Sequence, residues 1–373
     1  MTQLRNVAIV GFAQAPIVAR DEHRTAQEML YPQVRRALEE CGVSRDDIDY
    51  QVAGSSDYID GRPFGFVMAL DVMGSWPPRQ DLHVEMDAAF AAYYAWLRMQ
   101  AGDCDTAIVC GYGKSSEGDL DRVLNLQLDP FYLGAIGLDP TSTAALQASV
   151  FMEREKKSDL DLAEVTARNR AAGARNPDAL VREATSPDDL AATEWVAAPL
   201  RAGYLAPKGE TAVCLVLAAE GKAESMCDHP VWIQGLDQRI EMQNLGARDL
   251  AVSAGTELAT RKALAMSGLA TAADCDLVEL SAANAAEEMI LCGAMGLDPE
   301  KPQPVINPSG GALCGHPLMM TGLIRLGEVF RQLSGRAGER AVPDAERAMA
   351  HATSGHCLQQ NLVIVCGKDR RWT

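Results

Sequence analysis

The sequence predicts an α/β protein built from two similar halves, and two observations carry that prediction. Apolar runs typical of buried strands alternate with helical patterns, an order that favours parallel sheets covered on both faces. A segment of the first half also recurs in the second: Ala37–Val52 reads ALEECGVSRDDIDYQV, and Ala263–Val278 reads ALAMSGLATAADCDLV. A length of 373 residues suits two packed domains better than one core.

The two copies of the repeat share the order of their elements. Each runs from the end of a helix through a glycine and a short polar turn to an aspartate that precedes an apolar run. Gly42 and Gly268 occupy the position after a helix where the backbone needs a positive φ. Asp49 and Asp276 hold equivalent places, with one residue of insertion between the copies. Internal duplication is the interpretation that we adopt.

The repeat also sets the expected domain organisation. Val7–Gly11 (VAIVG) opens the first half as a buried strand, and Val231–Leu236 (VWIQGL) opens the second. The polar stretch Lys222–Pro230 lies between them, so we predict domains at residues 1–225 and 226–373. Residues from about 115 to 195 carry several helical patterns, and we expect them to form an inserted loop domain over a site.

Charge and composition make several classes of function less plausible for this chain. The formal net charge of −17 disfavours binding to nucleic acid or to a membrane surface, while one local basic patch would still hold an anionic ligand. The first residues lack a basic region and a long apolar run, so we expect no signal peptide, and no stretch is long enough to span a bilayer. The ten cysteines form no CxxC pairs, which favours reduced thiols in a cytoplasm and no metal site.

The strongest candidate site lies in the segment Asn307–Gly322, which reads NPSGGALCGHPLMMTG. Glycines allow the backbone to approach a ligand closely, which makes Gly310, Gly311 and Gly315 candidate ligand-binding residues. His316 follows at the edge of a loop that enters a helix, and we favour a site role for it. The alternative is a glycine-rich turn with a capping histidine.

This segment resembles the N-x-x-G-G-x-x-x-x-G-H-P-x-x-x-x-G pattern of the thiolase superfamily, with a gap one residue shorter. The motif NPDA at Asn176–Ala179, followed by VAAPLR at Val196–Arg201, resembles the sterol-carrier-protein-x or lipid-transfer-protein branch. The resemblance covers essentially the whole chain. It implies a duplicated thiolase fold of two βαβαβ-type halves in five layers, αβαβα, with an inserted loop domain. It also implies acyl-CoA thioesters as substrates, with no permanently bound cofactor.

The residue on which thiolase chemistry depends is missing. The family's reactive cysteine begins a helix whose N-terminus lowers the thiol pKa. The matching stretch here is Val84–Ala95, VEMDAAFAAYYA, and Asp87 stands at the cysteine position. An N-cap role is the favoured interpretation of this aspartate, and a role as catalytic base is the alternative. Acyl transfer through a cysteine thioester at this position is excluded.

Other positions of the family's site have also changed. Ser281 stands in place of a histidine, and Glu287–Glu288 replace an Asn-Glu pair, so that Glu288 alone matches. His351 and His356 lie in the loop region that replaces the family's second cysteine, and each is either an acid or base or a loop histidine. Cys314 is the one cysteine that we expect near a pocket, although free cysteine is common in cores.

Three functions remain open. The leading hypothesis is a carbon–carbon lyase that cleaves a β-hydroxyacyl-CoA by a retro-aldol step, as the resemblance implies for steroid side chains, with a small zinc-ribbon/OB-fold partner subunit. His316 would stabilise the enolate, and His351, Glu288 or Asp87 would be the base. The alternatives are a non-catalytic thiolase-like subunit of a hetero-oligomer and an acyltransferase with another nucleophile. The strand Thr106–Gly111 is apolar and lacks the charges that protect exposed edges, so we expect it to be an edge strand that a homo- or heterodimer buries.

Overall fold

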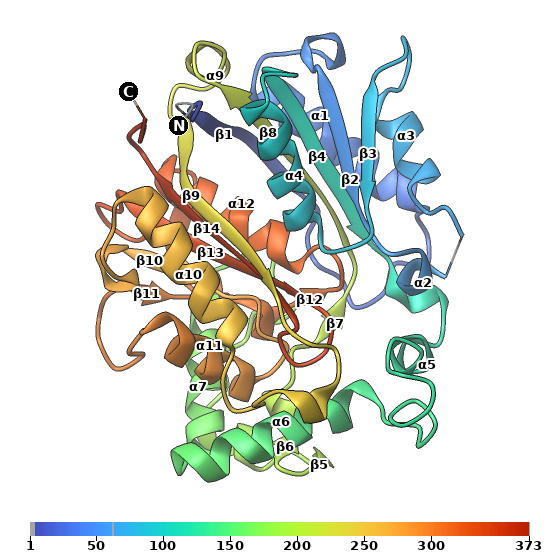
Figure 1. Cartoon of the computed structure of the whole chain (residues 1–373), viewed down its shortest axis with the longest axis vertical. Coiled ribbons are helices and arrows are strands. Elements are labelled where there is room, and N and C mark those ends of the chain that lie inside the picture. Colours follow the sequence, from blue (N-terminus) through green and yellow to red (C-terminus); the bar gives the residue numbers. More distant parts are fainter. Residues whose placement is uncertain (1–3, 62, 373) are drawn as a thin grey trace.

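The computed structural model describes residues 4–61 and 63–372. It confirms the predicted α/β class, because strands of both halves form one mixed sheet in the order β11-β10-β13-β14-β9-β1-β8-β4-β2-β3, with helices on both sides (Figure 1). The strands of the first half are β1 (Val7–Gln14), β2 (Tyr50–Gly54), β3 (Gln80–Val84), β4 (Thr106–Gly113) and β8 (Thr211–Ala219). Those of the second half are β9 (Val231–Ile240), β10 (Leu277–Glu279), β11 (Val305–Ile306), β13 (Arg347–Ser354) and β14 (Gln360–Gly367).

The two halves have the same topology, which confirms the predicted duplication. β2 pairs in parallel with β3 and β4, and β10 pairs in parallel with β11 and β13. In both halves the next two pairings are antiparallel, through β8 to β1 and through β14 to β9. The halves join where β1 pairs with β9, at Ala8 with Trp232 and Ile9 with Val231. Because they share one sheet, the boundary near residue 225 stays a prediction.

The repeated segments occupy equivalent environments. Gly42 follows α1 (Ala26–Glu40) with φ 65°, and Gly268 follows α10 (Ala254–Ser267) with φ 77°. Oδ2 of Asp49 accepts hydrogen bonds from the amides of residues 105 and 106, at the start of β4. Oδ2 of Asp276 accepts them from the amides of residues 346 and 347, at the start of β13. The aspartate therefore fixes the start of the neighbouring strand in both halves.

The helices complete the layered arrangement. α4 (Ala88–Gln100) and α12 (Thr321–Leu333) pack against each other and against strands of both halves, so they form the middle layer. α1 covers β1 and β8 on one outer face, and α10 covers β9 and β14 on the other. This pattern confirms the five predicted layers. Small residues permit the close packing of helices on strands, since a Cβ on Gly235 of β9 would lie 2.1 Å from the carbonyl oxygen of Ala263 in α10.

The remaining elements surround this core. The helices between residues 115 and 195 belong to the predicted insertion and lie in the lower part of Figure 1. The helices are α2 (Asp57–Asp60), α3 (Val67–Met73), α5 (Leu120–Asn125), α6 (Pro140–Glu155), α7 (Asp159–Gly173), α8 (Pro187–Ala191), α9 (Ala223–Met226) and α11 (Ala285–Met295). The short strands are β5 (Trp195–Ala197), β6 (Leu200–Arg201), β7 (Lys208–Gly209) and β12 (His316–Pro317).

The expectation that residues 106–111 form an edge strand is wrong. β4 lies between β8 and β2 and is buried along its whole length. Its apolar sequence on both faces is therefore that of an interior strand. The edge of the first half is β3, which carries Gln80, Asp81 and His83 and is largely exposed. Charged and polar side chains are the usual protection of such an edge.

Candidate functional site

Asp87 joins the N-termini of the two middle-layer helices. Its Oδ1 accepts a hydrogen bond from the amide of Ala89 at 2.9 Å, as expected for the N-cap of α4. The same carboxylate also accepts the amides of Gly322 at 2.8 Å and Leu323 at 3.2 Å, in the first turn of α12. The side chain is buried, which raises its pKa to about 7, and the three amide hydrogen bonds oppose that rise. Asp87 thus caps two helices, and its predicted role as a base stays a prediction.

His316 lies on the short strand β12, beside the junction of α4 and α12 that Asp87 caps. This strand pairs in parallel with β7, where Lys208 is the register partner of His316. The imidazole Nδ1 lies 2.8 Å from Oγ1 of Thr321, the first residue of α12. Burial, with smaller effects of the Lys208 and Arg325 charges, lowers the pKa of His316 to about 4. At neutral pH the imidazole is therefore uncharged and carries one N–H.

A cavity of about 200 Å³ brings Asp87 and His316 together. Residues of both halves and of the insertion line it. The polar side chains on its wall include those of Asp87, Lys208, Ser281, Glu287, His316, His356 and Cys357. Its apolar wall includes Ile59, Leu124, Leu205, Met319 and Leu358. A small apolar cavity with a few convergent polar groups is the usual form of a ligand or active site.

A larger hollow of about 650 Å³ lies elsewhere, between α7, α10 and α11. Its wall carries more acids than bases, among them Glu155, Asp161, Glu164 and Glu257 against Lys157 and Arg168. Negative charge of this kind repels the phosphates of an anionic ligand such as CoA. We therefore assign the site to the smaller cavity.

Glu288 does not border the cavity. It is buried in a polar cluster, where its carboxylate pairs with the Arg168 guanidinium and accepts amide hydrogen bonds from Asn169 and Asn307 at 2.9–3.0 Å. These contacts tie α7 of the insertion to α11 and to the loop after β11. The carboxylate thus holds elements together, and nothing supports its predicted role as a base.

Glu287, which was not among the predicted site residues, is the glutamate that lines the cavity. Glu288 was predicted in its place because it alone matches the pattern that the resemblance implies. Asn284 marks the start of the helix as its N-cap, but this local signal does not show which of the two glutamates faces the cavity.

His351 lies in the core. It sits fully buried in β13, with Nε2 3.1 Å from Oδ1 of Asn361, and it does not line the cavity. Burial lowers the pKa of His351 to about 4. His356 borders the cavity and donates from Nε2 to the carbonyl of Leu124 at 3.1 Å. The predicted role of His351 as a base therefore has no support from its position.

The three glycines pack against protein atoms and do not border the cavity. A Cβ on Gly310, where φ is 92°, would lie 2.6 Å from Cα of Gly173 in α7. One on Gly311 would lie 2.7 Å from Nδ2 of Asn307, and one on Gly315 would lie 2.8 Å from Cδ1 of Ile17. The glycines thus allow the loop to pack under the insertion, and ligand binding by them stays a prediction.

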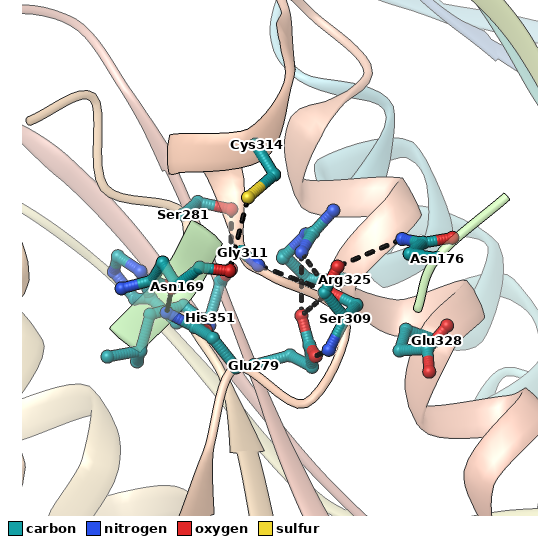
Figure 2. Close-up of polar contacts among 12 residues, drawn as sticks. Asn169, Asn176, Glu279, Ser281, Ser309, Gly311, Cys314, Arg325, Glu328 and His351 are labelled. Carbon is teal, nitrogen blue, oxygen red and sulfur yellow. Dashed lines mark hydrogen bonds and ion pairs between the residues drawn. The ribbon is translucent and has the colours of Figure 1, made fainter. Parts of the chain in front are cut away.

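A buried ion pair anchors this loop (Figure 2). Arg325 of α12 lies 2.7 Å from Oε2 of Glu279, and Ser309 donates its hydroxyl to the same oxygen at 2.8 Å. Asn176 of the insertion donates to the carbonyl of Ser309 at 2.9 Å. Since both charges are fully buried, removing either one would leave the other uncompensated. The network fixes the loop that leads to His316.

Neither Cys314 nor Cys357 is a good candidate for a nucleophile that could replace the missing cysteine. Cys314 is buried away from the cavity and donates its thiol to the carbonyl of Asn169 at 3.2 Å (Figure 2). Cys357 borders the cavity, but burial and the charge of Glu287 raise the pKa of its thiol to about 12. A thiol with so high a pKa stays protonated and is a poor nucleophile.

Over residues 4–61 and 63–372, no cluster of three or more His, Cys, Asp or Glu side chains has the arrangement of a metal site. Within the same ranges, no helix combines the length and the apolarity that crossing a bilayer would require.

Comparison with known proteins agrees with this architecture. The family model described as "Thiolase C-terminal domain-like" matches residues 302–368. Human sterol carrier protein 2 is 26% identical over 294 residues, which cover 70% of this chain and 53% of that protein. The acetyl-CoA acetyltransferase of Methanothermobacter thermautotrophicus is 26% identical over 380 residues, covering 94% of this chain and 97% of the relative. The chain therefore spans about half the length of the human protein.

Solved structures show the same fold at low identity. The Ltp2-ChsH2(DUF35) aldolase matches with a TM-score of 0.81 at 17% identity, over 97% of both chains. A monomeric SCP2-thiolase like protein type 1 from Mycobacterium smegmatis matches with a TM-score of 0.80 at 17% identity, over 100% of this chain and 80% of that one. The chain is thus a thiolase-fold protein. In sequence it is similar to the thiolase C-terminal domain over residues 302–368 and to sterol carrier protein 2 over 70% of its length.

Proposed function

We propose that this chain binds acyl-CoA thioesters and cleaves a carbon–carbon bond of a β-hydroxyacyl-CoA by a retro-aldol step. The observation that carries the proposal is the neutral imidazole of His316 on the cavity wall. On the same wall, the helix-capping carboxylate of Asp87 stands in place of the nucleophile. An N–H of this imidazole can stabilise the negative charge that forms on the thioester oxygen.

The reaction fits a site without a nucleophilic thiol. A base takes the proton of the β-hydroxyl group, the Cα–Cβ bond breaks, and its electron pair passes to the thioester as an enolate. Protonation at Cα then gives a shorter acyl-CoA and a carbonyl compound. No covalent acyl-enzyme forms, so the loss of the cysteine at position 87 does not prevent the chemistry.

The relatives allow this function and also an alternative one. One similar structure is an aldolase whose name pairs Ltp2 with ChsH2(DUF35), while another is a thiolase-like protein described as monomeric. The second candidate function is a non-catalytic subunit that binds acyl-CoA or braces a partner, and the changed position 87 favours it. For the lyase function we also propose a small zinc-ribbon/OB-fold partner, a steroid side chain as substrate and a cytoplasmic location.

A substrate panel separates the candidates. The protein is purified alone and with the products of neighbouring genes, then incubated with β-hydroxyacyl-CoA and β-ketoacyl-CoA esters of several chain lengths, and the products are identified by mass spectrometry. The proposed lyase releases an aldehyde or ketone from the hydroxy esters without free CoA as co-substrate. Cleavage of keto esters that requires CoA indicates a thiolase, and binding without turnover under every condition indicates the non-catalytic subunit.

A further inference from the structure

Glu287 differs from the other buried glutamates around the site. Glu279 pairs with Arg325, and Glu288 pairs with Arg168. In residues 4–61 and 63–372 no lysine or arginine forms an ion pair with Glu287, although its side chain is also buried. It is the one of the three that lines the cavity shared with His316. A buried carboxylate without a cation has a raised affinity for a proton.

Local structure holds this side chain in place. Its Oε2 accepts the amide of Ala283 at 2.7 Å, while Oδ1 of Asn284 accepts the amide of Glu287 at 3.0 Å. Asn284 is the N-cap of α11, and the carboxylate of Glu287 reaches one residue further out, to the amide of Ala283. A bond to a backbone amide does not by itself require burial against a cavity, since Glu28 accepts the amide of Thr25 in an exposed position. Only one of the two carboxylate oxygens of Glu287 accepts the Ala283 amide.

We propose that Glu287 takes the proton of the β-hydroxyl group and returns it to Cα in the cleavage reaction. The assignment rests on the proposed function. The carboxylate accepts the hydroxyl proton as the Cα–Cβ bond breaks, and the departing fragment leaves as an aldehyde or ketone. The carboxylic acid so formed then protonates Cα of the enolate that His316 holds. One proton is taken and one is given back, so no co-reactant is needed.

The surroundings of Glu287 suit this cycle. Burial is the largest influence and raises the pKa of Glu287 to about 7, while the bonds from Ala283 and Asn284 oppose the rise. The charge of Glu287 raises the pKa of Cys357. Four further titratable residues border the same cavity, namely Asp87, Lys208, His316 and His356, and Lys208 forms its ion pair with Asp121. A base with a pKa near 7 exists in both protonation states at neutral pH, as a group that takes and returns a proton should.

The test compares Glu287→Gln with wild type in single-turnover cleavage of a β-hydroxyacyl-CoA that the wild-type protein cleaves. We expect the rate to fall by roughly a hundredfold or more while the substrate Kd changes by less than about threefold. The pH profile should lose its ionisation near 7. In D2O, the shorter acyl-CoA should exchange its Cα protons on wild type and not on the variant. Glu257→Gln changes an exposed acid in the first turn of α10 and is the matched control.

The outcomes are distinguishable. Normal cleavage, an unchanged pH profile and continued Cα exchange in the folded Glu287→Gln variant would overturn the assignment and leave the lyase function standing. A wild-type protein that binds the esters but cleaves none of them would overturn the proposed function and this assignment with it. Circular dichroism and thermal unfolding of each variant show whether the lost rate reflects lost folding, and Glu287→Asp, which keeps the carboxylate, should recover part of the rate of a folded protein.

Discussion

The carboxylate of Asp87, at the start of α4, accepts a hydrogen bond of 2.8 Å from the amide of Gly322, at the start of α12. The two residues belong to equivalent helices of the duplicated halves. One side chain therefore caps both helices of the middle layer, at the position where the resemblance to thiolases implies a nucleophilic cysteine. The relationship explains how the scaffold keeps its central junction without the cysteine.

Replacing this carboxylate should destabilise the fold. In Asp87→Asn the amide group would face the N–H of Gly322 or Leu323 with a donor of its own, in a fully buried position. We expect the free energy of unfolding to fall by about 1–3 kcal/mol, because buried N–H groups lose their acceptor. Urea denaturation measures the change. A loss below about 0.5 kcal/mol would show that the double cap contributes little.

Glycines with positive φ should differ according to what surrounds them. Gly42 has open space around its Cα, whereas Gly310 lies against the backbone of Gly173. Gly42→Ala should cost about 1–2 kcal/mol through backbone strain alone. Gly310→Ala should cost clearly more, since the loop or α7 must also move. Equal losses for the two variants in thermal unfolding would contradict the packing role assigned to Gly310.

The buried histidine of the core predicts a pH dependence of stability. Burial holds the pKa of His351 at about 4, below its ordinary value of 6.5. Its contribution is present above pH 6.5 and is lost as the pH falls toward 4, because the unfolded chain then binds a proton that the folded chain does not. The loss by pH 5 should be about 1–2 kcal/mol.

Comparison with a variant isolates this effect from the titration of other groups. Wild type and His351→Gln are unfolded by urea at pH 7.5 and at pH 5. The destabilisation caused by the substitution should be smaller at pH 5. A difference that does not change with pH would mean that His351 titrates normally in the folded protein.

The corrected edge strand predicts where a dimer would form. β3 is the open edge of the first half, and Leu82 on it is 37% exposed. If a homo- or heterodimer pairs through this edge, Leu82→Lys should weaken it at least tenfold, while a lysine at exposed Leu160 in α7 should not. Sedimentation equilibrium gives the dissociation constant. A stable wild-type monomer at micromolar concentration, with and without candidate partners, would contradict the predicted dimer.

Most of the fold and part of the candidate site could be predicted from the sequence. The repeat around Asp49 and Asp276 identified the duplication because a strand start fixed by an aspartate leaves a local pattern in each copy. The strand at residues 106–111 was assigned to the edge wrongly, because apolar side chains on both faces fit an interior strand equally well and neighbours come only from topology.

The candidate site, like the fold, could be predicted only in part. His316 was found through the glycine-rich segment around it, and the structure places it on the cavity wall. Glu287 and Glu288 are adjacent in sequence but point to different environments, one to the cavity and one to Arg168. Which of two neighbouring helical residues faces a cavity depends on packing between distant segments, and no local pattern records that.

The central claim is that His316 stabilises an enolate during carbon–carbon cleavage. The most direct measurement is single-turnover cleavage of a β-hydroxyacyl-CoA by wild type, His316→Ala and His316→Gln, with any partner subunit present. We predict a loss of roughly a hundredfold or more for His316→Ala with little loss of stability, and a smaller loss for His316→Gln, which can still donate a hydrogen bond. Equal rates for all three proteins would contradict the claim and favour a non-catalytic subunit.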